Sequence, residues 1–362
     1  MVCNGLTLQE REDELLQELT QYSDEGLLID PNTFQGTAFR WLVDTDPTQV
    51  CPDETLNVQQ RYILALFYYS MGGDSWIQCT AATSPTPGLC VSEFRRYLST
   101  SNVCFWFGIV CSGDAIQGIF LDENNLSGEL PSELEFLTAL VDIDLDSNKL
   151  ISGEIPSSLG NLPVVESIDL DDNQLSGPIP ENLYNAVTLT AIDLDDNQLE
   201  GSLSPSVSNL VDLEFLFLDK NEMTGEIPSE IGLLDNLEAM HLDGNDFEGV
   251  IPDEVGDMAS ILELTFHNNP SITGEIPSSI QNLDTLQILS LHNTGISGQV
   301  PSELGRLTNL LSLTLHFNDL TGTMPDEICA LRTSGSLALL TVNCDRVECA
   351  QPACCTACFQ SQ

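Results

Sequence analysis

A motif of 24 residues repeats along the middle of the chain and constrains the fold more than any other feature. We count nine copies between Ile116 and Thr333, and they follow the template LxxLxLxxNxLxGxIPxxLxxLxx. Two copies are one residue longer, with insertions near Ile151 and Pro270. A unit of this length cannot bury its apolar face alone, so such units stack on their neighbours. The sequence therefore predicts a solenoid of nine coils.

Each fixed position of the template predicts a structural role. The leucines of LxxLxL alternate with other residues, which is typical of a short strand whose leucines point into the solenoid. Stacked strands predict a parallel β-sheet on the concave side. The Asn is expected to turn its amide inward and satisfy backbone groups at the bend, and the eighth repeat has Thr294 there instead. The Gly suits a closely packed backbone position.

Motifs at both ends of the repeats extend this interpretation. Residues 104–111 read CFWFGIVC, residues 60–69 read QRYILALFYY and residues 72–76 read GGDSW. Together with the GxIP element, they resemble the N-terminal cap and repeats of plant-type leucine-rich repeat proteins, namely receptor-like kinase ectodomains and polygalacturonase-inhibiting proteins. Residues 34–42 and the Cys-rich ending after Cys344 are similar to the flanks of diatom leucine-rich repeat receptor-like proteins. The resemblance implies an α/β solenoid, a right-handed superhelix with disulfide-rich caps at both ends.

The pattern of composition predicts four segments. Residues 1–54 form an acidic, helical leader that ends in a linker, and residues 55–114 form the N-terminal cap. Residues 115–333 hold the nine repeats, and residues 334–362 form a Cys-rich C-terminal cap. A solenoid exposes a leucine layer at each end and needs caps. We therefore expect the leader to provide extra capping and a linker, with a stalk or partner site as the alternative.

Twelve cysteines lie towards the two ends of the chain. An even number in clusters predicts disulfides and an oxidising compartment. Proximity and the family's pattern predict the N-terminal pairs Cys79–Cys90 and Cys104–Cys111. Cys3 and Cys51 remain, and they are expected to form a third pair, Cys3–Cys51.

The six C-terminal cysteines allow 15 pairings. We expect only one of them from the sequence, Cys329–Cys344. A zinc site is the alternative, because Cys355 and Cys358 have the spacing of metal ligands. The acidic surroundings and the lack of a nearby His favour disulfides.

The positions between the strand leucines predict the exposed face of the sheet, because side chains alternate along a strand. Two columns of residues share this face, and all four histidines of the chain belong to them. The candidate ligand-binding residues are Phe120, Asp122, Asp144, Asp146, Asp169, Asp171, Asp193, Asp195, Phe217, Asp219, His241, Asp243, His267, His292 and His316.

Neighbouring carboxylates about 5 Å apart repel by roughly 0.8 kcal/mol per pair in bulk water. A divalent cation, a basic ligand or protons are expected to offset this repulsion. The histidines add a segment that titrates between about pH 5 and 8. The alternative is that repeat duplication copied a solvated Asp and a His without any ligand. No flanking residues complete a tetrahedral site, so no metal ligands are predicted, although bound Ca²⁺ remains an open alternative.

The charge and the missing motifs exclude several classes of function. The chain has 56 acidic and 10 basic side chains and a net charge of -46. This balance argues against nucleic-acid binding and against direct contact of this segment with an anionic membrane. A phosphate-binding Gly-rich loop, HExxH and a nucleophile elbow are absent, as is the kinase of receptor relatives, so we expect no enzyme.

The sequence thus predicts an extracellular recognition module, either a receptor-like ectodomain or a secreted binder. Its ligand is expected to be a protein, peptide or glycan, basic or cation-bridged, held on the acidic concave face. The alternative is an acidic cell-surface or matrix protein that binds Ca²⁺ or other cations. The sequon at Asn125 predicts a glycan. Residues 1–11 have no apolar signal core, and any membrane anchor is expected outside this chain.

Overall fold

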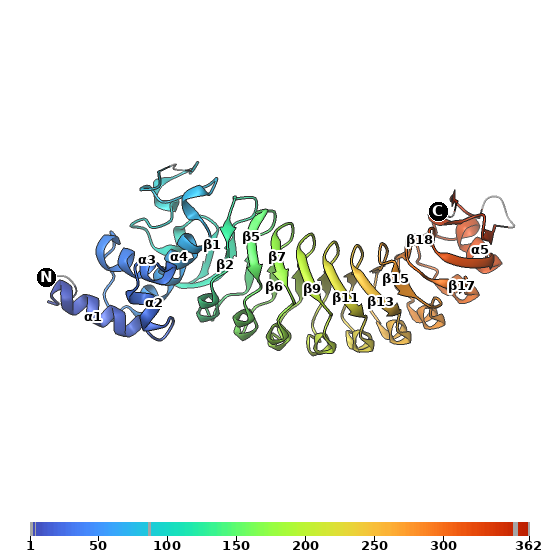
Figure 1. Ribbon diagram of the computed structural model, residues 1–362, viewed down its shortest axis with the longest axis horizontal. Coiled ribbons are helices and arrows are strands. Elements are labelled where there is room, and N and C mark those ends of the chain that lie inside the picture. Colours follow the sequence, from blue (N-terminus) through green and yellow to red (C-terminus); the bar gives the residue numbers. More distant parts are fainter. Residues whose placement is uncertain (1–2, 4, 86–87, 350–353, 361–362) are drawn as a thin grey trace. The chain divides into compact units, whose positions relative to one another are not determined.

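The computed structural model describes residues 3, 5–85, 88–349 and 354–360. The chain folds into two compact units, Met1–Ser176 and Gly177–Gln362. Within each unit, successive coils lie side by side and each contributes one strand to a parallel sheet (Figure 1). The leader and the N-terminal cap belong to the N-terminal unit, and the C-terminal cap belongs to the C-terminal unit.

The N-terminal unit contains four strands of this sheet and a shorter second ladder. The sheet strands are β1 (Ile109–Ser112), β2 (Ala115–Phe120), β4 (Asp142–Asp144) and β6 (Ser167–Asp169), of which only β1 pairs antiparallel. The second ladder is β3 (Ser127–Gly128), β5 (Leu150–Glu154) and β7 (Gln174–Gly177). The 3-10 turns that follow it are η5 (Ser132–Phe136) and η6 (Ser157–Asn161).

The C-terminal unit repeats this plan. Its sheet strands, all parallel, are β8 (Ala191–Asp193), β10 (Phe215–Phe217), β12 (Ala239–His241), β14 (Glu263–Thr265), β16 (Ile288–Ser290), β18 (Ser312–Thr314), β20 (Leu339–Asn343) and β22 (Ala357–Phe359). The second ladders are β9 (Gln198–Gly201), β11 (Glu222–Glu226), β13 (Asp246–Val250) and β15 (Ser271–Thr273), and β17 (Ser297–Gln299), β19 (Asp319–Thr323) and β21 (Val347–Glu348).

Helical segments complete the coils and the C-terminal cap of this unit. They are η7 (Glu181–Asn185), η8 (Pro205–Asn209), η9 (Ser229–Leu233), η10 (Asp253–Asp257), η11 (Ser278–Asn282), η12 (Ser302–Arg306) and α5 (Asp326–Ser334). The nine predicted strand segments are strands, and their leucines form the core. β20 and β22 extend the parallel sheet into the cap, which the repeat template does not reach.

From the second repeat on, the Asn bonds to backbone groups at the turn after the strand, as predicted, and Thr294 takes its place in the eighth repeat. In the coil of Asn245, the Nδ2 amide donates to the carbonyl of Leu218 in the preceding coil at 2.8 Å and to that of Leu242 at 3.2 Å. The Oδ1 atom accepts from the backbone N–H of Met223 at 3.0 Å. Backbone groups that would be buried without partners are satisfied in this way, and adjacent coils are joined.

The residue immediately before the Asn (or before Thr294) has a left-handed backbone in every repeat. Its φ lies between 47° and 64° in Glu123, Ser147, Asp172, Asp196, Lys220, Gly244, Asn268, Asn293 and Phe317. Apart from Gly, the residue types that tolerate this region best are Asn and Asp. At Lys220 this bend carries the ammonium group to Asp219, the outward-facing residue before it, which matters at the candidate site.

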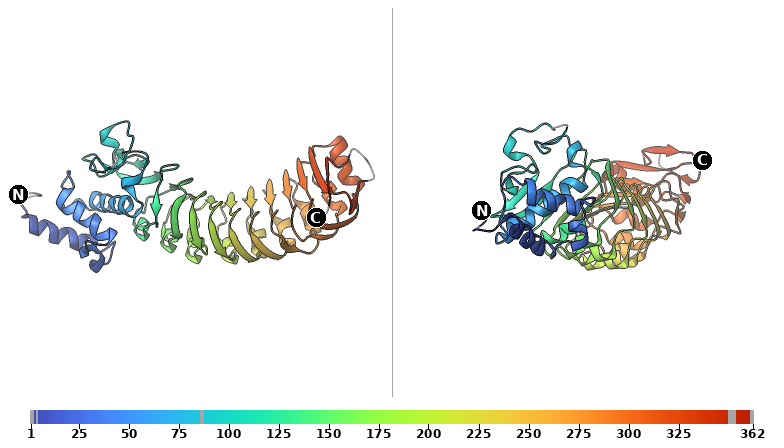
Figure 2. Two further views of the ribbon diagram at one scale, coloured as in Figure 1. Left: turned by 45° about the horizontal axis from the view of Figure 1, so that its top comes forward. Right: turned by 60° about the vertical axis from the view of Figure 1, so that its left-hand side comes forward.

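The leader is helical, and it packs on the N-terminal cap. Its helices are α1 (Leu8–Leu19), α2 (Glu25–Ile29) and α3 (Phe34–Arg40), and the cap helix is α4 (Thr55–Ser70). Thr7 and Glu10 form a capping box at the start of α1. Figure 2 shows these helices, in blue, gathered at one end of the coils of their unit.

The segment that the sequence predicts as a linker, at the end of the leader, is anchored at two points. Asp46 and Val50 are only 3% and 1% exposed. Arg61 of α4 donates to Asp46 at 2.6 and 3.1 Å, and Arg11 of α1 donates to the carbonyl of Val50 at 3.1 Å. Two arginines therefore tie the segment into one core with α1 and α4.

The disulfides agree with the sequence at one end and differ at the other. The structure contains the pairs Cys3–Cys51, Cys79–Cys90 and Cys104–Cys111. The predicted Cys329–Cys344 pair is wrong, and the C-terminal pairs are Cys329–Cys354, Cys344–Cys358 and Cys349–Cys355. The reason is strand β22, which returns to pair with β20 and sets Cys358 beside the end of that strand.

Candidate ligand-binding face

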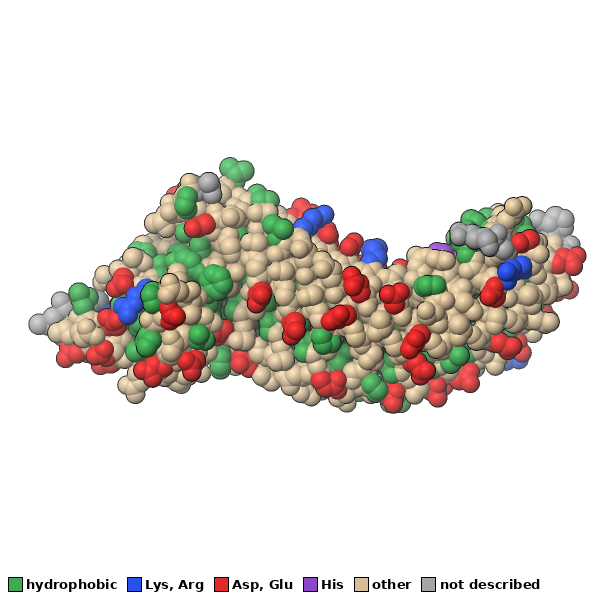
Figure 3. All heavy atoms as spheres, viewed as in Figure 1, with side chains coloured by type: hydrophobic (Ala, Val, Ile, Leu, Met, Phe, Trp, Pro, Cys, Tyr) green, Lys and Arg blue, Asp and Glu red, His purple; other side chains and the backbone are tan. Residues whose placement is uncertain are grey.

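The outward-facing side chains of the long sheet form the surface that we call the sheet face. In the N-terminal unit the strand register aligns Phe120, Asp144 and Asp169 in adjacent coils. The second column of this unit holds Asp122, Asp146 and Asp171, each two residues farther along. Figure 3 shows acidic side chains over much of the visible surface and few lysines or arginines.

The carboxylates of the N-terminal unit raise one another's pKa. Partial burial, followed by repulsion from Asp144 and Asp169, raises the pKa of Asp146 to about 6. The pKa of Asp144 is also raised, first by burial and then by Asp169. The Nζ atom of Lys149 lies 3.2 Å from Oδ2 of Asp172, one position beyond the column. This part of the sheet face is strongly acidic, with one ammonium group at its edge.

In the C-terminal unit, Lys220 enters a cluster of three carboxylates. Its Nζ atom lies 3.4 Å from Oδ2 of Asp219, 3.8 Å from Asp195 and 3.9 Å from Asp196. Asp219 is only 7% exposed, and burial with the charge of Asp243 raises its pKa. The pKa of Asp195 is raised by burial and by Asp219. The cluster thus concentrates negative charge around an ammonium group that the chain itself supplies.

The next coil shows how the acidic column gives way to histidines. Asp243 is 9% exposed, accepts a hydrogen bond from Thr265, and lies 3.2 Å from Nε2 of His267. In the parallel column Phe217 packs on His241, with ring centroids 4.6 Å apart. Asp193 lies beside Phe217 in the register. The acidic cluster therefore has an aromatic side.

The three histidines of the second column stack on one another. Ring centroids are 4.2 Å apart between His267 and His292 and 4.5 Å apart between His292 and His316. Phe359 of β22 continues the stack at 4.0 Å from His316. The Nδ1 atoms of His292 and His316 lie 3.0 and 2.8 Å from threonine hydroxyls of the neighbouring coils. Parallel rings cannot direct their nitrogen lone pairs at one ion.

Burial and mutual repulsion keep this stack neutral near pH 7. Burial, and then repulsion from the other two histidines, lowers the pKa of His292 to about 4. The pKa values of His267 and His316 are lowered too, mainly by burial. A folded-state pKa below the unfolded value of about 6.5 means that the unfolded chain binds more protons. The contribution of the stack to the free energy of unfolding therefore decreases as the pH falls from about 6.5 towards 4.

Replacing His292 by Phe is expected to remove part of this acid sensitivity, because Phe can stack but cannot be protonated. The melting temperature of the variant relative to the wild-type chain should rise as the pH falls from 6.5 to 4. Comparing the two proteins cancels the carboxylates, whose raised pKa values act in the opposite direction. Calorimetric melts across this range measure the difference, and a constant difference would contradict the prediction.

Sequence reasoning missed the role of several neighbours of the two columns. The sequence contains only two lysines, and both carry their ammonium groups to carboxylates at the edge of the sheet face. A signal was present for Lys220, since it directly precedes the Asn of its repeat. Thr265 and Phe359 were also missed. Phe359 lies outside the repeats, and no periodic pattern points to it.

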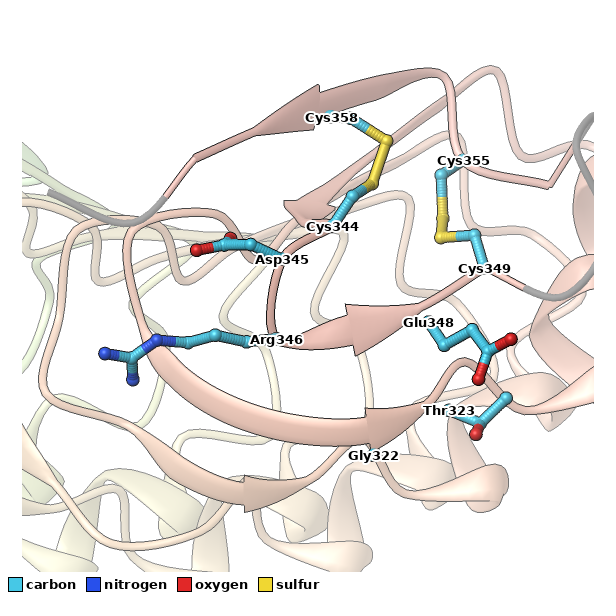
Figure 4. A pocket seen from close by; sticks show the side chains of 9 residues that line it. All are labelled: Gly322, Thr323, Cys344, Asp345, Arg346, Glu348, Cys349, Cys355 and Cys358. Atoms are coloured by element: carbon cyan, nitrogen blue, oxygen red, sulfur yellow. A yellow bond between two sulfur atoms is a disulfide. The ribbon is translucent and has the colours of Figure 1, made fainter.

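A separate hollow lies in the C-terminal cap (Figure 4), and its volume is about 640 Å³. Its lining residues are Gly322, Thr323, Cys344, Asp345, Arg346, Glu348, Cys349, Cys355 and Cys358. Two disulfides form part of the wall, and Arg346 is ion-paired with Asp319. All four cysteines of this lining are disulfide-bonded, so none of them is a free thiol.

Three further sequence expectations concern metal, membrane and glycan. Across the residues with described positions, no three His, Cys, Asp or Glu side chains are grouped so that they could hold a metal ion. Nor does any helix in the described ranges have the length and apolar character to cross a bilayer. The Nδ2 amide of Asn125 donates to the carbonyl of Ser75 at 2.9 Å. A glycosylated amide keeps one N–H, so Asn125 stays a predicted glycosylation site.

A comparison with protein families identifies the repeats. The family described as "Leucine-rich repeat region" matches residues 182–343, and the one described as "Leucine Rich Repeat" matches residues 139–162 and 165–186. A comparison with curated proteins gave no match.

Among solved structures, the chain is similar to ectodomains of plant receptors. The ectodomain of GASSHO1/SCHENGEN3 from Arabidopsis thaliana, in complex with CASPARIAN STRIP INTEGRITY FACTOR 2, is 33% identical with a TM-score of 0.64. The match covers 68% of this chain and 29% of that one. The plant peptide hormone receptor RGFR1 in complex with RGF2 is 32% identical with a TM-score of 0.59, and the match covers 62% of this chain and 35% of that one.

A third similar structure is the Arabidopsis receptor kinase HAESA with the peptide hormone IDA and the co-receptor SERK1. It is 26% identical with a TM-score of 0.51, and the match covers 67% of this chain and 49% of HAESA. The chain thus spans less than half the length of these receptor chains. With its repeats, its parallel sheets and its disulfide-bonded caps, the chain is a leucine-rich repeat protein of the plant type.

Proposed function

We propose that this protein is an extracellular recognition module, and that its sheet face captures a peptide or protein carrying basic side chains. Receptors with similar repeats are seen in complex with the peptide hormone IDA and with RGF2. Six disulfides among the described residues are typical of chains that fold in an oxidising compartment. These observations support a binding role outside the cytosol.

The observation that carries the proposal is the position of Lys220. Its ammonium group lies within 3.9 Å of three carboxylates, although the Lys220 side chain is 58% exposed and has solvent available. An ammonium or guanidinium group of a ligand presents the same chemistry to this cluster. Phe217 and His241 beside it offer ring faces on which a guanidinium can stack. The ligand chemistry that fits is an Arg- or Lys-containing segment.

A tetra-arginine peptide tests this role by titration calorimetry with the full chain. We expect Asp195→Asn with Asp219→Asn to weaken binding by about tenfold or more, because charge-assisted hydrogen bonds are lost. Raising the salt from low to high concentration should weaken the wild-type complex as well. Lys220→Met should strengthen binding, because it removes the ammonium group that competes for the cluster.

The matched control removes the same charge on another face of the same unit. Asp253 and Glu254 are exposed residues of η10, and Asp253→Asn with Glu254→Gln should leave the affinity within about twofold. The proposal fails if the control weakens binding as much as the cluster variant does. It also fails if neither the salt concentration nor the double variant Asp195→Asn with Asp219→Asn changes the affinity.

A further inference from the structure

The N-terminal cap carries an exposed apolar patch that is separate from the sheet face. Six large apolar side chains in residues 77–110 are half exposed or more, and we call them the cap patch. Their exposed fractions are 52% for Ile77, 81% for Leu89, 94% for Val91, 55% for Phe94, 58% for Phe105 and 50% for Val110. Several exposed apolar side chains in one part of a soluble domain are typical of an interaction site.

The backbone under the cap patch is held in place, so the patch is a defined surface. The Cys79–Cys90 disulfide anchors the segment between Leu89 and Val91, whose two side chains flank Cys90. The N–H of Leu89 donates to the carbonyl of Ile77 at 2.9 Å. The Phe94 and Phe105 rings contact each other edge to face, with centroids 6.2 Å apart.

The charge of this region differs from that of the rest of the chain. Residues 75–113 contain one acidic residue, Glu93, and two arginines, in a chain whose net charge is -46. Arg95 lies 5.4 Å from the ring centroid of Phe107 and forms no ion pair with any residue whose position is described. Glu93 pairs with Arg96, and its side chain is 76% exposed. The cap patch therefore contains an unpaired cation and an accessible carboxylate within three residues.

We propose that the cap patch binds a second copy of this chain in a two-fold symmetric dimer. Two acidic molecules repel each other through much of their surfaces, and residues 75–113 carry little of that negative charge. A two-fold axis brings Arg95 of one copy towards Glu93 of the other, so the patch complements itself. Six side chains of this size at these exposures approach the roughly 800 Å² that one partner contributes to a standard interface.

The test is the oligomeric state of the full chain, measured by sedimentation velocity over a range of micromolar concentrations. The wild-type protein should show a concentration-dependent dimer. Leu89→Ser with Val91→Ser should raise the dimer dissociation constant by about tenfold or more, because both side chains lie in the interface. Both are almost fully exposed in one copy, so their replacement should leave the melting temperature unchanged.

The control pair is Val187→Ser with Val211→Ser, which removes exposed apolar side chains of 52% and 53% exposure from the C-terminal unit. The control protein should dimerise like the wild type. The proposal is overturned if the wild-type chain stays monomeric throughout the range, or if the Leu89 and Val91 variant dimerises normally. A monomer that binds phosphatidylcholine vesicles through Leu89 and Val91 would also overturn it and assign the patch to a lipid surface.

Discussion

Replacing Arg61 by Met is expected to destabilise the N-terminal unit by about 3–5 kcal/mol, because it leaves a carboxylate buried without its partner. The Arg61 and Asp46 side chains are 1% and 0% exposed and lie 2.6 Å apart. Arg61 also donates to the carbonyls of Ser99 and Ser101, each at 2.9 Å. Its guanidinium lies 5.3 and 5.2 Å from the ring centroids of Trp41 and Trp106.

Tryptophan fluorescence is suited to this measurement, because the three tryptophans of the chain are Trp41, Trp76 and Trp106. All three belong to the N-terminal unit, so urea unfolding followed by fluorescence reports on that unit. Arg40→Met is the control, because Arg40 is 41% exposed in its ion pair with Glu12. Exposed pairs contribute about 1 kcal/mol or less.

A double variant tests whether the buried charge is the cause. Arg61→Met combined with Asp46→Leu should recover much of the lost stability, since two apolar side chains can replace a buried ion pair. If Arg61→Met costs no more than Arg40→Met, the arginine does not join the leader to the cap in the way described. If the double variant is as unstable as the single one, the loss comes from packing around the tryptophans.

Asn269→Ala is expected to cost about 3 kcal/mol in the C-terminal unit, because it leaves buried backbone groups without partners. Asn269 is fully buried. Its Nδ2 amide donates to the carbonyls of Leu242 and Phe266 at 3.0 and 2.9 Å, and its Oδ1 atom accepts from the N–H of Phe247 at 3.0 Å. One side chain thus serves two adjacent coils.

Hydrogen exchange measured by mass spectrometry can locate this effect, since it resolves individual coils. Faster exchange is expected in the coils that contain Phe247 and Phe266, with little change two coils away. Asn282→Ala is the control, because Asn282 is exposed at the end of η11. Asn269→Thr should be milder than Asn269→Ala, because Thr294 occupies the same position in the eighth repeat and bonds to Leu291. Equal effects of the Ala and Thr variants would contradict this account.

The periodic part of the fold could be predicted from the sequence because each coil repeats the same pattern of residues. Nine copies of one template reveal which leucines are buried, where the strand lies and what the Asn does. The single-copy contacts follow no such pattern. Arg61 meets Asp46, and Cys344 meets Cys358, through folding of segments that lie outside the repeats. The pairing of Cys329 with Cys344 was therefore predicted wrongly, and the buried anchor points at the end of the leader were not predicted.

The candidate site likewise combines features that follow the repeat pattern with contacts that do not. The spacing of 24 residues predicts which aspartates and histidines share a column, and the strand registers align them within each unit. How deeply each residue is buried depends on its neighbours, so the low exposure of Asp219 and Asp243 could not be predicted. The position of Lys220 depends on the left-handed turn, which the template marks only as an unspecified residue.

That turn has a consequence for how such a surface can change. The left-handed residue contributes neither to the apolar interior nor to the strand. Coils with Ser147, Asp172, Lys220 or Phe317 at this position form the same bend. A substitution there alters the charge beside one coil while the coil itself is conserved. Substitutions at this position can therefore change the charge along the sheet face one repeat at a time, without altering the coils that carry it.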